Sequence, residues 1–259
     1  MHFRRQLTRA VAEAIALGRT FARPRRGFRI LMYHAVESRV PGDTLDVFRV
    51  TPGLFSKQMA ALAAFPDSVV AGIRNAVPAR APLQVAITFD DGYRDNLRLA
   101  APVLLKHGFA FTVFATAGFI RSGKEPFLSP TELRELAALP QVTIGAHGVT
   151  HVPLTRCDDR QLREELTGSK HYLEDLLGRP VKELAYPHGA VDRRVRDAAG
   201  LAGYDLGATS HFNINTAGRD PLLLARNAIL ASDDVRAFIQ KLRGDWDWYR
   251  WRSPDPAAA

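Results

Sequence analysis

Short apolar strand candidates alternate with helix-type segments along most of this chain, and that alternation restricts the fold more than any other feature. The strand candidates are rich in β-branched and aromatic residues and lie at 28–34, 85–89, 110–116, 142–147, 183–187 and 204–210. The helical candidates lie at 51–65, 93–107, 129–139, 158–178 and 192–200, and a last pair of elements follows at 223–229 and 232–243. About seven such βα units, with no break in composition, predict a parallel sheet that is either a barrel or an open doubly wound sheet.

The choice between these two sheets rests on phosphate-binding motifs. Neither GxGxxG nor GxxxxGK[ST] occurs, which counts against an open sheet that binds a nucleotide. We therefore predict an α/β fold of the distorted barrel type. The single cysteine, Cys157, excludes an internal disulfide framework and a cysteine-based zinc site, and we expect it to be a bystander thiol.

The positive charge of the chain is concentrated at its beginning. Residues 1–28 contain seven arginines and one glutamate, so this arm carries +6 of the total net charge of +8. The body is nearly balanced and lacks aromatic residues interleaved among basic ones, so we expect no nucleic-acid partner. No apolar run approaches the ~20 residues that span a bilayer. The stretch "AVAEAIALG" fits a signal peptide poorly, because Glu13 interrupts it and more arginines follow.

Ionisable side chains recur directly after the predicted strands. His34 ends the first strand candidate, and Asp90 and Asp91 follow the second. His147 ends the candidate at 142–147, and His211 follows the one at 204–210. The carboxyl ends of successive parallel strands open on one mouth, where barrels of this kind place catalysis. Each of these residues alone is weak evidence, but their repeated position at strand ends indicates one shared site.

Two neighbouring carboxylates at the end of an apolar strand repel each other and resist burial, which indicates a positive charge beside them. The stretch "HGVTH" provides two imidazoles, His147 and His151, and Gly148 and Pro153 disfavour a helix there. We interpret it as a strand-end loop that brings both rings to one side. Two histidines and one aspartate form a metal site with positions left open for water or substrate. The second carboxylate would then stay free as a base.

Three short motifs resemble those of the polysaccharide deacetylases, the nodulation-deacetylase-like group of carbohydrate esterases. "TFDDGY" (88–93) and "HGVTH" (147–151) are similar to the first two motifs of that family, in the same order and about sixty residues apart. "AYPHG" (185–189) resembles the third motif more loosely, and the resemblance extends over roughly residues 28–230.

The resemblance implies a distorted (β/α) barrel, a divalent metal and the hydrolysis of N-acetyl groups on amino sugars. By this resemblance Asp91, His147 and His151 bind the metal, and Asp90 is the general base. The backbone N–H of Tyr93 helps to hold the oxyanion. The substrate side of the site is expected at Tyr186, Pro187, His188, Gly189 and His211.

The sequence departs from the family pattern at three points. Ala185 stands where the family has an arginine that orients the base, and His188 stands where it has an aromatic residue after the proline. The late leucine-x-x-histidine motif, which supplies a general acid, is not recognisable in "LLLARNAIL". In a subgroup acting on poly-N-acetylglucosamine that histidine comes from an N-terminal strand, and "LMYHAV" with His34 resembles that arrangement. His188 and His211 remain the alternatives for the acid.

The function expected from these residues is metal-dependent removal of N-acetyl groups from a carbohydrate, with zinc as the first metal and Co²⁺, Ni²⁺ or Fe²⁺ as alternatives. A second interpretation keeps the chemistry but changes the substrate to an O-acetyl ester or a small amide. A third is a glycan-binding protein without turnover, which Ala185 and the missing late histidine favour. The intact set of two aspartates and two histidines argues against it, because a pure binder has no use for a spare carboxylate beside a metal.

We predict three parts along the chain: a basic amphipathic N-terminal segment (1–27), a deacetylase-like catalytic barrel (28–243) and a Trp-rich C-terminal tail (244–259). In the last segment Trp246, Trp248 and Trp251 either cover the barrel exterior, stack on sugar rings or lie at a membrane interface.

The first segment has the pattern of an amphipathic helix over residues 5–20. The apolar face comprises Leu7, Val11, Ala14, Ile15 and Gly18, and the nearby arginines are Arg4, Arg5, Arg9 and Arg19. This pattern favours a helix lying on an anionic membrane surface, and the alternative is a solvated or barrel-packed helix. If this helix lies on a membrane, we expect an enzyme at the cytoplasmic face of that membrane that acts on a lipid-linked or nascent surface glycan.

Overall fold

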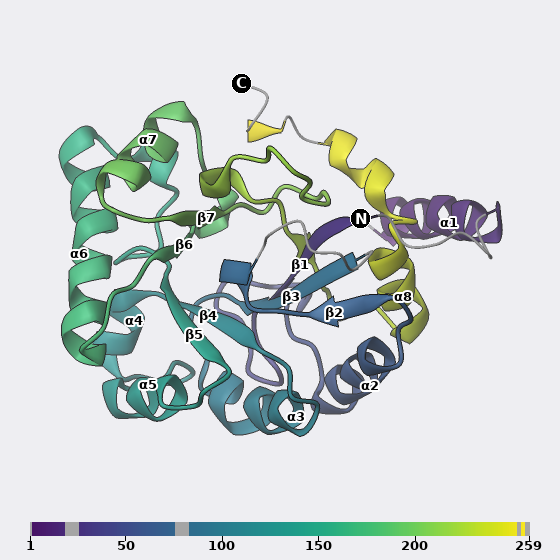
Figure 1. Cartoon of the computed structure of the whole chain (residues 1–259), viewed down its shortest axis with the longest axis horizontal. Helices are drawn as coiled ribbons and strands as arrows, with labels where there is room; N and C mark the ends of the chain where they lie inside the picture. Colours follow the sequence, from purple (N-terminus) through teal and green to yellow (C-terminus); the bar gives the residue numbers. More distant parts are fainter. Residues whose placement is uncertain (1, 19–25, 76–82, 253–254, 257–259) are drawn as a thin grey trace.

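The fold is built on one curled parallel sheet, with helices outside it (Figure 1). The computed structural model describes residues 2–18, 26–75, 83–252 and 255–256. The strands are β1 (Gly27–Tyr33), β2 (Ser68–Val70), β3 (Leu83–Phe89), β4 (Phe111–Ala115), β5 (Val142–Ala146), β6 (Glu183–Ala185), β7 (Leu206–Ala208) and β8 (Asn227–Ala228). They lie in the order β7-β6-β5-β4-β3-β1-β8, β2 pairs with β3, and each of these pairings is parallel.

The two edges of the sheet are joined by the segment around β8. Leu224 forms a parallel bridge with Ala208 of β7, in which Leu224 donates to the carbonyl of Gly207 at 2.8 Å and accepts from Thr209 at 2.8 Å. A few residues later β8 pairs with Leu31 and Met32 of β1. The sheet therefore curls into the distorted (β/α) barrel that the alternation of elements predicts.

The helices cover the outer face of this sheet. They are α1 (His2–Gly18), α2 (Pro52–Ala63), α3 (Ala101–Lys106), α4 (Ala117–Ser122), α5 (Pro130–Ala137), α6 (Asp159–Leu177), α7 (Arg193–Leu201) and α8 (Val235–Arg243). Capping side chains explain where several begin: Thr51, Ser129, Asp158 and Asp192 each accept a hydrogen bond from the backbone N–H three residues later. The sequence analysis missed β2 and α4, because a three-residue strand and a six-residue helix carry little periodicity.

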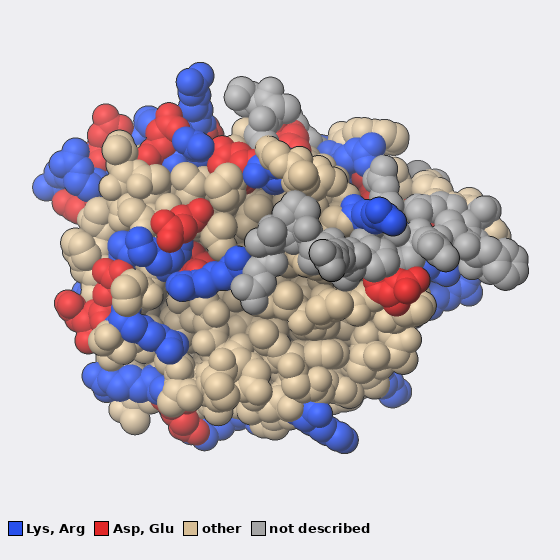
Figure 2. Space-filling view, in the orientation of Figure 1, with Lys and Arg blue, Asp and Glu red and all other residues tan. Residues whose placement is uncertain are grey.

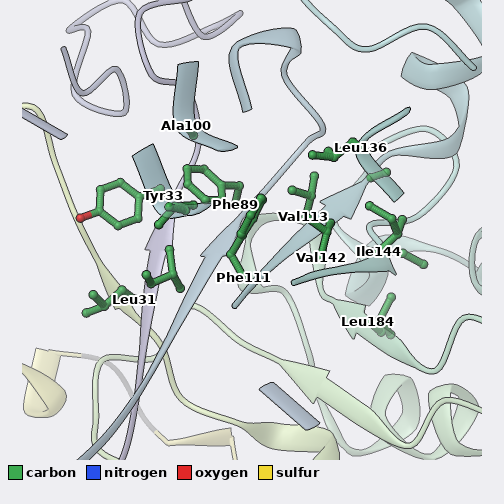
Figure 3. Close-up of a cluster of buried hydrophobic side chains, with 14 of the residues drawn as sticks. Leu31, Tyr33, Phe89, Ala100, Phe111, Val113, Leu136, Val142, Ile144 and Leu184 are labelled. Carbon is green, nitrogen blue, oxygen red and sulfur yellow. The ribbon is translucent and has the colours of Figure 1, made fainter. Parts of the chain in front are cut away.

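Alternating side chains divide the interior into two cores. Leu31, Tyr33 and Phe89 point outward into the large cluster between sheet and helices (Figure 3). Their neighbours Ile30 and Ala86 belong to a second cluster on the opposite face, inside the barrel. The members of this inner cluster are Phe28, Ile30, Ile73, Ala86, Phe114, Ala185, Ala208 and Leu224.

Small residues inside the barrel make room for large ones. A Cβ added to Gly145 of β5 would lie 2.5 Å from the Phe114 ring and 3.0 Å from the carbonyl of Glu183. The site described below therefore sits above a filled interior, as barrel folds require.

Both ends of the described chain pack against the barrel. On α1, Ala12 and Ala16 are buried, and ion pairs join Arg9 to Asp234 and Glu13 to Arg236 at α8. No described helix is both long and apolar enough to cross a membrane. On the face shown in Figure 2 the acidic and basic side chains of the body are interspersed.

The C-terminal segment is held by a buried ion pair. The two terminal guanidinium nitrogens of Arg29 on β1 donate to the carboxylate of Asp247, at 2.9 and 3.3 Å. Trp246 and Trp248 are half-buried, whereas Trp251 is 75% exposed. The predicted covering role therefore describes the first two tryptophans better than the third.

Candidate metal centre and active site

The turn after β3 directs two adjacent carboxylates into the barrel mouth. Asp90 continues the inward alternation of Ala86 and Thr88. Asp91 and Gly92 then take left-handed φ values of 72° and 84°. A continuing strand would turn the Asp91 side chain to the opposite face, and the left-handed turn prevents this. Aspartate is among the non-glycine residues that tolerate such a backbone.

Asp91, His147 and His151 converge on one point. The Oδ1 atom of Asp91 lies 3.5 Å from Nε2 of His147 and 3.1 Å from Nε2 of His151. One ligand atom from each residue lies within 4.8 Å of the other two. Among the residues that the structure describes, this buried Oδ1 has no hydrogen-bond donor. An orphaned carboxylate oxygen between two imidazoles fits a divalent metal ion.

The surroundings of His147 prepare it as a ligand. Its Nδ1–H donates to the backbone carbonyl of Ala185 at 2.7 Å, so Nε2 is free of the proton and faces Asp91. Burial lowers the pKa of His147 to about 4, which leaves the ring neutral near pH 7.

The charges of Asp91 and His151 support each other. Burial raises the pKa of Asp91, but the nearby imidazoles of His151, His147 and His34 outweigh it and bring that pKa below its usual range. Burial likewise opposes the charged form of His151, but the Asp91 carboxylate outweighs it and raises the pKa of His151. The Asp91 carboxylate is therefore negatively charged at neutral pH.

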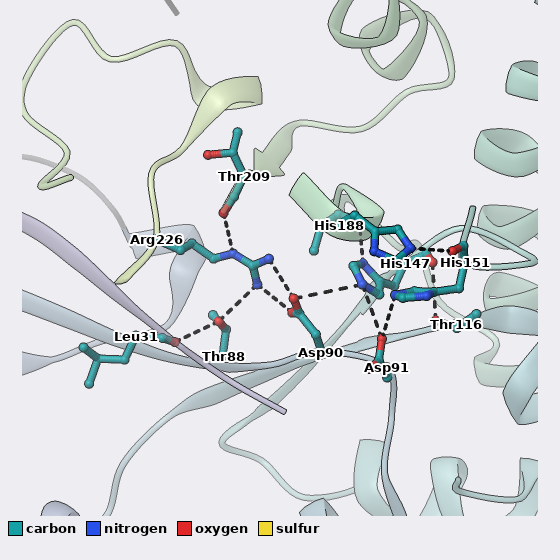
Figure 4. A network of polar contacts seen from close by, with 11 residues as sticks. Leu31, Thr88, Asp90, Asp91, Thr116, His147, His151, His188, Thr209 and Arg226 are labelled. Carbon is teal, nitrogen blue, oxygen red and sulfur yellow. Dashed lines mark hydrogen bonds and ion pairs between the residues drawn. The ribbon is translucent and has the colours of Figure 1, made fainter. Parts of the chain in front are cut away.

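Asp90 lies beside this cluster and is paired with Arg226 (Figure 4). Two nitrogens of the guanidinium donate to the two carboxylate oxygens at 2.6 and 2.8 Å, and Nε donates to the carbonyl of Thr209 at 2.8 Å. Burial raises the pKa of Asp90, but Arg226 and His147 outweigh it and lower that pKa. The second Asp90 oxygen is still 4.0 Å from Nε2 of His147. Asp90 is thus an ionised carboxylate beside the metal cluster.

Sequence reasoning missed Arg226, which lies directly before β8. Ala185 stands in place of the family arginine, and no other residue was predicted to take that role. In the structure Ala185 belongs to the small inner cluster, and the guanidinium of Arg226 lies 5.4 Å from the centre of the Phe114 ring in the same interior. The available signal was an arginine inside the apolar run "LLLARNAIL", since an unpaired buried arginine is rare.

His34 lies on the same mouth, one residue after β1. Its ring is half-buried and packs 4.5 Å from the Phe48 ring. It is one of the neighbours that lower the pKa of both Asp90 and Asp91. In the described part of the chain its buried Nδ1 has no hydrogen-bond partner. His34 therefore offers an uncommitted imidazole nitrogen near both carboxylates.

Known proteins resemble this chain over its whole barrel. YxkH of Bacillus subtilis strain 168, whose curated name assigns it provisionally to the polysaccharide deacetylases, is 29% identical over 230 residues, 83% of this chain and 76% of its own length. The deacetylase PplD of Streptococcus pyogenes, solved in complex with acetate, has a TM-score of 0.73 at 26% identity over 85% of this chain and 99% of that one.

A second solved structure is BC0361, a polysaccharide deacetylase from Bacillus cereus, with a TM-score of 0.73 at 27% identity over 84% of this chain and 69% of that one. The family model described as polysaccharide deacetylase matches residues 79–207. The chain belongs to the polysaccharide deacetylase family. Membership supports deacetylase activity and agrees with the motif resemblance in the sequence.

In this deacetylase-family chain Tyr93 directly follows the left-handed turn of Asp91 and Gly92. No acceptor for its N–H occurs within the described ranges, although its neighbours Arg94 and Leu128 are paired across the adjoining bridge. Its side chain is buried against Phe127, with ring centres 5.1 Å apart, and burial together with Asp91 raises the pKa of the phenol.

The third deacetylase motif separates into a buried and an exposed part. Tyr186 is buried and its hydroxyl donates to the carbonyl of Leu222 at 2.8 Å, so this side chain anchors the fold. Pro187 is buried as well. His188 is exposed, its ring lies 4.6 Å from that of His151, and its Nε2 is 3.1 Å from the carbonyl of His151. Of this motif, His188 is exposed and Gly189 is half-buried.

His211 is directed towards the C-terminal segment of this family member. Its Nε2 lies 3.6 Å from the carboxylate of Asp255, which also pairs with Arg219 at 2.6 Å. Burial lowers the pKa of His211, against the opposing charge of Asp255. The structure thus places His188 against His151 and His34 within electrostatic reach of Asp90 and Asp91, and it gives His211 a different acidic neighbour.

Proposed function

We propose that this protein is a metal-dependent hydrolase that removes N-acetyl groups from the amino sugars of a surface or lipid-linked glycan. The observation that carries the proposal is the pair Asp90 and Asp91 with separate partners: one carboxylate faces His147 and His151, and the other is fixed by Arg226. Two histidines and a carboxylate suit zinc first, and Co²⁺, Ni²⁺ or Fe²⁺ next.

The chemistry needs a polarised acetyl carbonyl and an activated water. A divalent ion held by Asp91, His147 and His151 would supply both, since metal ions lower the pKa of bound water from 15.7 to about 7. Asp90 takes the proton from the attacking water. Arg226 keeps Asp90 ionised and fixes both of its oxygens, so the base is oriented before the substrate arrives.

The remaining groups act on the acetyl oxygen and on the leaving nitrogen. The free N–H of Tyr93 donates to the oxyanion, an interaction of about 3–4 kcal/mol in comparable sites. His34 donates a proton to the departing amine, which leaves as the free amino sugar while acetate remains. Acetate in the structure of the related deacetylase PplD supports acetyl hydrolysis.

The test is release of acetate from a chitooligosaccharide, measured together with the free amine formed. An O-acetylated xylan serves as the second substrate. Equal amounts of acetate and amine support the proposal, whereas acetate from the xylan alone would indicate an O-acetyl esterase. Metal analysis of His147→Ala, His151→Ala and the surface control His171→Ala should show loss of metal in the first two only. Retention of metal by both would refute the assigned ligands.

We also propose that α1 holds the enzyme against an anionic membrane on the cytoplasmic face. The helix buries Ala12 and Ala16 against the barrel, while Val11 and Leu17 are 37% and 73% exposed. Ala14 of the predicted apolar face is exposed and Ile15 half-buried. The side chains of Leu7, Arg4, Arg5 and Gly18, and the whole of Arg19, lie outside the described residues.

Flotation with anionic liposomes at low and high salt tests this location. Near such a membrane each basic residue contributes about 1 kcal/mol before screening, so binding should weaken as salt rises. A chain starting at Gly27 and the full-length variant Leu17→Asp should both float less than the wild type. Equal flotation of all three, or of none, would exclude α1 as the anchor.

A further inference from the structure

A buried carboxylate from α6 stands behind the loop that carries both histidine ligands. Glu165 is 4% exposed. Its Oε2 accepts from the backbone N–H of Val149 at 2.7 Å and of Thr150 at 3.0 Å, and its Oε1 accepts from the Thr150 hydroxyl. Three donors of the loop 147–151 therefore converge on this one side chain.

The beginning of α4 holds the same loop from the other side. The N–H groups of Ala117 and Gly118 donate to the carbonyls of Gly148 and Val149, at 3.0 and 2.9 Å. The fit is close, because a Cβ on Gly118 would lie 2.5 Å from the Val149 carbonyl oxygen and one on Gly148 would lie 2.9 Å from Oε2 of Glu165.

The loop needs this support because its backbone is strained. Gly148 and His151 have left-handed φ values of 70° and 62°. Such a conformation costs about 1–3 kcal/mol at a residue other than glycine, so it persists only where the surroundings enforce it. The hydrogen bonds to Glu165 end one residue before His151.

The buried carboxylates around the site lack enough positive charge beside them, and a divalent cation would supply it. Asp90 is paired with Arg226 through both of its carboxylate oxygens. Glu165 has no ion-pair partner among the described residues, and the Asp91 carboxylate is paired only with the imidazoles of His147 and His151 among them. Buried charges need compensation, and two positive charges at the ligand cluster would supply it.

We infer that Glu165 is a positioning residue of the metal centre, which holds the loop 147–151 in its left-handed form and contributes the second negative charge that the cation neutralises. This inference rests on the metal site of the proposed function. It assigns no contact between Glu165 and the metal. Residues that orient metal ligands from outside are typically worth 10–100-fold in metal affinity.

The test is the affinity of the full-length protein for Zn²⁺ and Co²⁺, measured by competition with a chromogenic chelator. Glu165→Gln keeps the size of the side chain and removes the charge and one acceptor, so we expect binding about 10–100-fold weaker and an altered visible spectrum of bound Co²⁺. The matched control is Glu164→Gln, whose side chain is 62% exposed on the same helix and should bind as the wild type does.

Two further variants separate loop geometry from charge. Thr150→Val removes one hydrogen bond and keeps the carboxylate, so it should weaken binding much less than Glu165→Gln. Glu165→Asp keeps the charge but shortens the side chain by one methylene group. It should weaken metal binding if the loop geometry matters. Unchanged affinity and an unchanged Co²⁺ spectrum in Glu165→Gln or, should that protein not fold, in Glu165→Asp would overturn the inference. A wild-type protein that binds neither metal would instead refute the proposed function.

Discussion

At the scale of single residues, two neighbouring aspartates acquire different chemistry from different partners. Asp90 shares its oxygens with Arg226, and Asp91 faces two imidazoles. The left-handed turn at Asp91 allows both carboxylates to face the same mouth. Without separate partners, two adjacent buried carboxylates could not both remain ionised.

Exchange of each carboxylate for an amide should separate these roles. Asp90→Asn should keep the metal and lower turnover by about 10²–10⁴, since it removes the proton acceptor. Asp91→Asn should release the metal, because the amide carries no charge to hold it. Metal analysis and acetate release measure the two effects, with exposed Asp175→Asn as the control. Near wild-type turnover in Asp90→Asn would contradict its role as the base.

The general acid is tested by three histidine variants. His34→Ala should lower turnover by about 10²–10⁴ and leave metal content unchanged, because it removes a proton donor and no ligand. His188→Ala should have a smaller effect, since His188 contacts the outer side of His151, and so should His211→Ala, since His211 faces Asp255. If either of these shows the larger loss with metal retained, the acid lies there and not at His34.

At the scale of elements, a two-residue strand decides how the base is held. β8 pairs with β1, and the same segment bridges to β7 through Leu224. This places Arg226 beside β1, with β3 as the next strand, and its side chain reaches Asp90 inside the barrel. A longer strand would be easier to recognise in the sequence, but the short one suffices because both neighbours fix its register.

Loss of Arg226 should therefore be costly for both stability and activity. Arg226→Met leaves Asp90 as an unpaired buried charge, which should destabilise the metal-free protein by about 3–5 kcal/mol in urea unfolding. Arg226→Lys should recover part of the stability but less of the activity, because an ammonium lacks the two-pronged geometry.

The double variant Arg226→Met with Asp90→Asn provides the control for this prediction. It removes both charges and should regain stability relative to Arg226→Met alone. If the double variant were as unstable as the sum of the two single variants, the pair would not act as a unit.

At the scale of the whole molecule, the two ends of the described chain close the outside of the barrel. Arg29 on β1 is buried with Asp247, and Phe212 packs against Tyr249 with ring centres 5.6 Å apart. The Trp-rich segment predicted as a tail is therefore tied to the first strand. The contacts of His211 and Arg219 with Asp255 extend the same closure.

The variant Asp247→Asn tests how much this closure contributes to the stability of the fold. The change leaves the fully buried guanidinium of Arg29 without its charge partner, and the expected loss is about 3–5 kcal/mol in the free energy of unfolding. The control Asp205→Asn breaks an ion pair whose carboxylate is 67% exposed and should change stability by at most about 1 kcal/mol. Similar unfolding curves for both variants would show that the closure is dispensable.

Much of this protein could be predicted from local patterns in its sequence. The βα alternation predicted the order of the main strands and helices, because periodicity and capping residues act within a few positions. The motifs around Asp91 and His147 predicted that Asp91, His147 and His151 lie together, since each motif ends a strand and parallel strands share one mouth. Short elements such as β2 and α4 gave too little periodicity to be recognised, whereas β8 lies within the element predicted at 223–229.

Tertiary structure alone decided which groups support that cluster. Arg226 lies 136 positions from Asp90, and their contact exists only because the sheet curls until β8 meets β1. Glu165 reaches the histidine loop because α6 packs behind it, and Ala185 is tolerated because Arg226 occupies the interior from another strand. Such contacts depend on barrel closure and on side-chain volume. No local propensity encodes either, so the cluster of Asp91, His147 and His151 could be predicted from the sequence and its supports could not.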